Sequence, residues 1–157
     1  MPTTSEVSVF RPRRLRILAV VMSVGLAVLV VVGWFALPLS LRQAFTVSQL
    51  LTLSALLGLL IFVMGAIAAS YVRADADGLQ LRNGLRTHAV AWDQVHKIML
   101  RPGDPWGVLL LKPADGSAFE VDLDAEKRQL MGIQANDGEL ARAAIAQLRQ
   151  RQRDAAA

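Results

Sequence analysis

Two long apolar runs dominate the first half of the chain. Residues 17–37 and 47–71 contain no formally charged side chain, and Pro38 follows the first run. About 20 apolar residues in a helix suffice to cross the hydrocarbon core of a bilayer. A core helix that is apolar all round would find too little partner surface in a protein of this size. We therefore predict two membrane-spanning helices joined by the short connection 38–46, which makes them an antiparallel hairpin.

Arginine positions predict the orientation of this hairpin. Residues 1–16 form a basic segment that precedes the first span, Arg73 follows the second, and the connection carries only Arg42. Positively charged flanks are retained in the cytoplasm, so both termini and everything after the second span are predicted cytoplasmic, in the inner (plasma) membrane. A cleaved signal peptide is the alternative, but the apolar run is long and a second span follows at once.

Small residues recur at a spacing of four in both spans. They are Ala19, Ser23 and Ala27 in the first span, and Ser54, Gly58, Gly65 and Ala69 in the second. Such ridges let helices approach closely. We expect packing within the hairpin, with homo-oligomerisation or association with another membrane protein as the alternative. Neither span holds an acidic or basic side chain, which disfavours a transporter acting alone.

Residues 72–153 change to short alternating segments separated by turns, and 154–157 form a tail. This pattern predicts antiparallel strands at 72–74, 79–82, 85–92, 95–101, 106–112, 118–123 and, more weakly, 129–133. Apolar positions at helical spacing then predict a C-terminal helix (Leu140, Ala141, Ala144, Ile145 and Leu148). Asn136, three residues before Glu139, resembles a capping box. The fold class is α+β: a helical hairpin, six or seven strands in a barrel or sandwich, and a helix.

The Asn83-Gly84 pair predicts a hairpin turn. A two-residue turn there would pair Arg82 with Leu85. We prefer a three-residue loop with a glycine bulge, because pairing Leu81 with Leu85 separates apolar from polar faces better. Thr87, Ala89 and Ala91 would then face the core, with Gln80, Arg86 and His88 outward.

Charge location excludes nucleic-acid binding. The chain has a net charge of +4, and residues 1–72 hold five arginines against Glu6, again +4. Residues 73–157 hold twelve basic and twelve acidic side chains, so the polar domain is neutral and lacks the excess that phosphate binding needs. The absence of cysteine removes thiolate metal sites and cysteine nucleophiles. We expect no cofactor and no metal.

The order of six or seven strands followed by one helix is that of a pleckstrin-homology (PH)-like domain. The chain resembles the bacterial PH-domain family that includes the actinobacterial low-molecular-weight protein antigen 6 proteins. The resemblance lies in Tyr-Val-Arg-Ala-Asp (71–75), Asp-Gly-Leu (77–79), Arg-Asn-Gly-Leu-Arg (82–86), Trp92 with Val95, Arg-Pro-Gly-Asp-Pro-Trp (101–106) and Gly-Ile-Gln-Ala-Asn-Asp-Gly (132–138). It implies a membrane-tethered PH-like module and carries no ligand or activity with it.

Two sets of residues are candidate contacts. The loop from Arg101 through Asp104 to Trp106 combines stiffening prolines with an aromatic ring, which favours a protein-binding site or, equally, a cap on the core. Arginines near the bilayer are candidate lipid-headgroup contacts (Arg11, Arg13, Arg14, Arg16, Arg73, Arg82 and Arg86).

Catalysis and metal binding have weaker support. His88, His96 and Asp93 lack a third well-spaced metal ligand, and a Ser117, His88 and Asp93 triad has no supporting motif. We therefore predict a non-catalytic, membrane-anchored interaction or scaffold module, or an accessory subunit of a membrane complex. An anionic-lipid sensor is the alternative.

Overall fold

The computed structural model describes residues 7–113 and 126–156. The described chain forms two compact units. One contains residues 15–68, and the other combines residues 7–14 with everything described from residue 69 onward. The segment before the first long helix thus belongs to the same unit as the C-terminal half of the chain.

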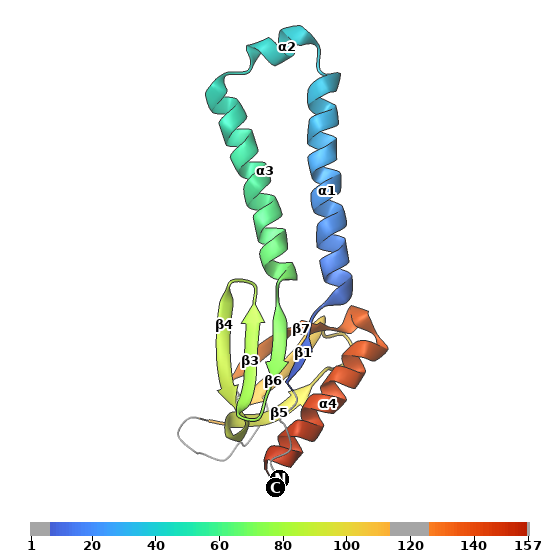
Figure 1. The fold of residues 1–157 in the computed structure, drawn as a ribbon, viewed down its shortest axis with the longest axis vertical. Coiled ribbons are helices and arrows are strands. Elements are labelled where there is room, and N and C mark those ends of the chain that lie inside the picture. The colour runs from blue at the N-terminus through green and yellow to red at the C-terminus, as the bar shows by residue number, and fades with distance from the viewer. Residues whose placement is uncertain (1–6, 114–125, 157) are drawn as a thin grey trace. The chain divides into compact units, whose positions relative to one another are not determined.

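The helical unit is the predicted hairpin. It contains α1 (Arg13–Ala36), the short α2 (Leu39–Ala44) and α3 (Val47–Ala68), drawn in blue to green in Figure 1. At 1.5 Å per residue the two long helices measure about 36 and 33 Å. Both are long and apolar enough to cross a membrane. The helix α3 ends three residues before the predicted limit, because Tyr71 already belongs to a strand.

The second unit contains seven described strands in two antiparallel sheets. The sheet β1-β2-β3-β4 comes first in the chain and β5-β6-β7 second. Their bounds are β1 (Ser8–Phe10), β2 (Tyr71–Ala74), β3 (Gly78–Asn83), β4 (Arg86–Ala91), β5 (Val95–Met99), β6 (Trp106–Leu111) and β7 (Lys127–Gln134). Two 3₁₀ turns, η1 (Trp92–Gln94) and η2 (Ala135–Asp137), and the helix α4 (Glu139–Ala155) complete it. The predicted strand 118–123 lies outside the described residues.

The strand β1 is an element that the sequence analysis did not anticipate. It pairs antiparallel with β2, with Phe10 opposite Val72. The long hairpin is therefore inserted between two neighbouring strands of one sheet. Three residues beside an arginine-rich segment carry too little periodicity to reveal a strand.

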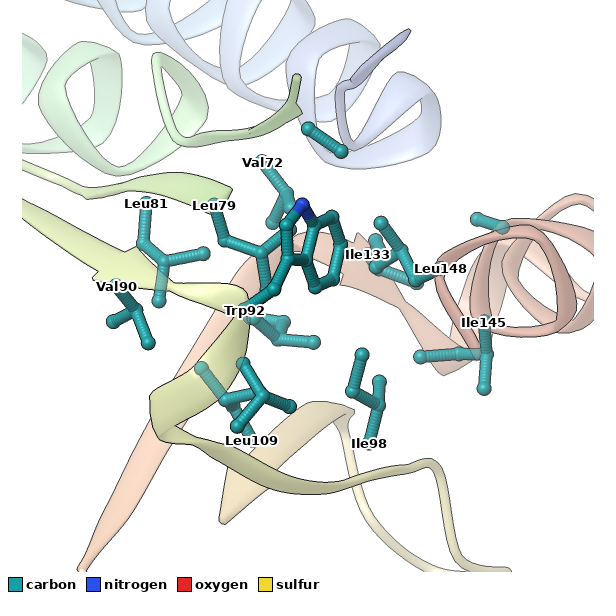
Figure 2. Packing of buried hydrophobic residues seen from close by; sticks show 14 of the residues in the cluster. Val72, Leu79, Leu81, Val90, Trp92, Ile98, Leu109, Ile133, Ile145 and Leu148 are labelled. Atoms are coloured by element: carbon teal, nitrogen blue, oxygen red, sulfur yellow. The ribbon is translucent and has the colours of Figure 1, made fainter. Parts of the chain in front are cut away.

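The core lies between the two sheets and α4. Figure 2 shows the Trp92 indole in the middle of the cluster, with Leu79, Ile133 and Leu109 around it. The Trp92 Nε1 donates a hydrogen bond to the carbonyl of Asp75 at 3.0 Å, so the buried ring has a partner for its polar atom. At one point the sheets meet backbone to backbone: a Cβ on Gly132 would lie 2.6 Å from the backbone of Tyr71 and Val72.

The register of the β3–β4 hairpin differs from the prediction. Asn83 pairs with Arg86, so Gly84 and Leu85 form a two-residue loop. Gly84 has φ of 63°, which suits the first central position of a type II′ turn. The change reverses the faces of β4. Val90 is buried, and His88 is half-buried opposite Leu81. The residues that we expected to face the core are exposed instead (Thr87, Ala89 and Ala91), and Leu85 and Arg86 are exposed as well.

Asn83 is not a turn residue because its side chain joins the two sheets. Its Nδ2 donates to the carbonyl of Gln129 at 2.7 Å, and its Oδ1 accepts the N–H of Met131 at 3.3 Å. The amide thus pairs with β7 as another strand would.

The C-terminal helix α4 differs from the prediction in two details. Gly138 is the N-cap, no side chain caps the helix, and Asn136 lies in η2, so the predicted capping box is wrong. Leu140 is 63% exposed, whereas Ala141, Ala144, Ile145 and Leu148 are buried. At about 100° per residue Leu140 falls roughly 90° from the centre of the buried stripe, which puts it at the margin of that face.

Candidate functional site

The predicted partner-binding loop is a closed, rigid turn. The N–H of Asp104 donates to the carbonyl of Arg101 at 3.1 Å, Pro102 lies at the second position, and Gly103 has φ of 94°. These are the features of a type II turn. The carboxylate of Asp104 also accepts the N–H of Arg101 at 3.2 Å. Arg101 and Asp104 are thus held together, and the Asp104 carboxylate has a structural role within the turn.

Trp106 begins β6 two residues after this turn. It is half-buried and is not part of the main buried cluster, whose tryptophan is Trp92. It lies opposite Gln134 at a shift of register, and the carbonyl of Pro105 accepts the N–H of Ala135 at 3.0 Å. The backbone at Trp106 is therefore held beside β7, and the residue itself is half-buried.

A groove of about 500 Å³ lies between the turn and α4. The turn lines one side with Arg101, Pro102 and Gly103, and α4 lines the other with Arg142, Ile145 and Arg149. The Nε of Arg149 donates to the carbonyl of Ile98 at 2.8 Å, and Arg142 forms an ion pair with Glu139 at 2.7 Å.

Sequence reasoning missed the contribution of α4 to this groove. The available signal was the spacing of seven between Arg142 and Arg149, which places them on one helical face. The groove beside the candidate loop is therefore lined mainly by apolar atoms, with three arginines among its lining residues (Arg101, Arg142 and Arg149).

The candidate lipid contacts do not form one cluster. Arg73 and Arg82 project from the outer face of their sheet; Arg73 pairs with Asp75 at 3.8 Å, and the Arg82 Nε donates to the carbonyl of Gly84 at 3.0 Å. Arg86 is exposed at the hairpin end of β4 and alternates to the other face. The remaining four belong to the exposed N-terminal segment and the start of α1 (Arg11, Arg13, Arg14 and Arg16).

The histidines lie on different sheets. His88 is on β4 and His96 on β5. Among the described residues no group of three or more metal-ligating side chains could hold an ion. Ser117, the serine of the weighed triad, lies outside the described residues.

In the helical unit, glycines do not form close contacts between the two long helices. A Cβ added to Gly25, Gly33, Gly58 or Gly65 would meet no atom within 4 Å. The expected packing within the hairpin is therefore wrong for Gly58 and Gly65. Near the connection, the rings of Trp34 and Phe45 pack edge to face, with their centroids 5.6 Å apart.

Two antiparallel sheets around one core, closed by a C-terminal helix, define a PH-like domain. The sequence agrees, because the family model described as "Bacterial PH domain" matches residues 70–151. The chain belongs to this bacterial PH-domain family. No curated protein and no solved structure matches it, so the resemblance to the antigen 6 proteins stays a prediction.

Proposed function

We propose that this protein is a membrane-anchored, non-catalytic interaction module, which recruits or scaffolds another protein or serves as an accessory subunit of a membrane complex. One observation carries the proposal: the apolar hairpin is inserted into the PH domain. Only residues 11–12 separate β1 from α1, and only residues 69–70 separate α3 from β2. Two residues span at most about 7 Å. Such short connections keep the domain at the membrane surface, where a recruiting module acts.

Both connections are fixed to the domain. Pro12 and Ser70 are fully buried. The N–H of Arg14 donates to the Asp137 carboxylate at 3.2 Å, and the Ser70 hydroxyl oxygen accepts the N–H of Gly84 at 2.9 Å. The residues that lead into and out of the hairpin therefore belong to the packed domain at both ends.

Cysteine labelling tests the orientation of the anchor. The natural chain has no thiol, so each introduced cysteine is a unique probe. In intact cells whose outer membrane or cell wall has been removed, Ser40→Cys in α2 is expected to react with a membrane-impermeant maleimide. Ala143→Cys, exposed on α4, is expected to react only after lysis, because arginine flanks hold the domain in the cytoplasm. Labelling of Ala143→Cys from outside would overturn this orientation.

A second prediction tests the loop. A photo-crosslinking amino acid at Arg142, an exposed position beside the groove, is expected to capture a protein partner in intact cells. Trp106→Ala should lower the yield of that adduct by about tenfold, the effect of losing one aromatic anchor. Trp106→Phe, which keeps an aromatic ring, should retain most of it. An unchanged yield with Trp106→Ala would exclude the tryptophan as a contact.

The alternative, an anionic-lipid sensor, is favoured by the exposed arginines that flank the start of α1. Each basic residue near an anionic surface contributes about 1 kcal/mol, and salt screens this attraction. Crosslinking in inverted membrane vesicles at low and high salt separates the two functions. An apolar, aromatic contact should persist at high salt, whereas headgroup attraction should fade.

A further inference from the structure

The strand β4 is an outer edge of its sheet, and within the described residues no further strand pairs with its free side. The edge of β5 is covered by α4, whose Arg149 and Gln152 side chains donate to the carbonyls of Ile98 and Val95. On β1, the Ser8 side chain is bonded by Gln147 and Arg151 of α4, and Asn83 pairs with the edge of β7. Figure 1 shows β4 at the margin of its sheet.

The register identifies which backbone groups this edge presents. Asn83 and Arg86 flank the two-residue loop, so they form a hydrogen-bonded pair, and such pairs alternate along the hairpin. Thr87, Ala89 and Ala91 therefore direct their N–H and C=O groups away from β3. Their side chains are small and exposed, which leaves room for a neighbouring strand.

The edge also lacks the devices that protect sheet edges. Natural edges carry lysines, prolines or bulges that prevent pairing with another chain. From Thr87 to Ala91 there is no charged residue and no proline, and the pairing of β4 with β3 is regular. A regular edge whose residues after Arg86 are uncharged is a template for strand addition.

Opposite charges mark the two ends of this edge. Arg86 is exposed at the hairpin end, with Arg82 on the adjacent strand. At the other end Asp93 lies two residues after β4, in η1, and Asp77 lies near it, because the Asp77 carbonyl accepts the N–H of Trp92 at 3.4 Å. Both aspartates are exposed. A complementary strand thus needs a basic residue at one end and an acidic residue at the other.

We infer that β4 binds an extended segment of a partner protein by adding it as a fifth strand. The segment runs antiparallel to β4, the slightly more stable pairing, with a basic residue near its start and an acidic residue about six positions later. Uncharged, β-branched residues between them would suit the small, exposed side chains of Thr87, Ala89 and Ala91. This inference rests on the proposed recruiting function and names the chemistry of the recruited segment.

The test uses the full chain in lipid nanodiscs and a synthetic peptide, acetyl-Lys-Thr-Val-Thr-Val-Thr-Glu-amide. Binding should slow hydrogen exchange at the amides of Thr87, Ala89 and Ala91, while the peptide with Lys and Glu exchanged should bind less tightly. Ala89→Pro removes an N–H that faces away from β3, so it should weaken binding by about tenfold or more without breaking the ladder. Ala89→Thr keeps the N–H and should bind as the natural chain does.

Three results would overturn the inference: equal binding by Ala89→Pro, protection of the three amides before peptide is added, or a dimer that Ala89→Pro dissociates. The last result would make the occupant a second copy of this chain. The adduct at Arg142 could form in cells while Ala89→Pro leaves peptide binding unchanged. That combination would support the recruiting function and exclude β4 as the binding site. If no adduct forms at all, the recruiting function fails independently.

Discussion

Replacing Leu148 by alanine is expected to lower the free energy of unfolding of the PH domain by about 2–5 kcal/mol. Leu148 is fully buried in the cluster between α4 and the sheets. The loss combines the transfer free energy of the deleted methyl groups with the cost of the cavity left behind. Urea titration of the full chain in detergent, followed by tryptophan fluorescence, measures the change, because Trp92 lies in the same cluster.

Leu140 provides the matched control on the same helix. Its side chain is 63% exposed, so Leu140→Ala should change the free energy of unfolding by no more than about 0.5 kcal/mol. Equal destabilisation by the two substitutions would mean that α4 does not pack on the domain through the face containing Leu148.

The second large effect is expected at Gly132. An alanine Cβ there would lie 2.6 Å from backbone atoms of Tyr71 and Val72, and backbone cannot move aside as a flexible side chain can. Gly132→Ala should therefore push β7 away from β2 and cost about 1–3 kcal/mol, as overpacking does elsewhere. The same urea titration measures it, and Gly132→Val should cost more.

Gly58→Ala is the control for that substitution. A Cβ at Gly58 in α3 meets no atom within 4 Å, so unfolding of the PH domain should be unchanged. If Gly132→Ala also left unfolding unchanged, the close approach of the two sheets at this glycine would be wrong.

Sequence patterns that extend over many residues made most of the fold predictable. Unbroken apolar runs gave the hairpin, and alternation gave most strands, because burial of one face fixes where apolar side chains occur. The face of β4 was wrong for a physical reason. Asn-Gly is a strong turn signal in isolation, but Asn83 bonds to Gln129 and Met131 of a strand more than 40 residues away. The residues around the turn give no indication of that long-range contact.

The candidate site was predictable only in part. The prolines and glycine of residues 101–106 indicated a stiff loop, and the structure holds Arg101 and Asp104 in one turn. The arginines of α4 that line the same groove were not found, since only tertiary packing brings α4 beside the turn. For the same reason β1 was missed: three residues become a strand because β2 supplies the pairing.

Insertion of the hairpin between β1 and β2 also sets an order of events during synthesis. Phe10 leaves the ribosome 62 residues before its partner Val72, a delay of roughly 3–12 s at ordinary translation rates. Throughout that interval the first strand waits while both apolar helices are made. The first sheet can therefore be completed only after both intervening helices have been translated, and until then β1 has no strand to pair with.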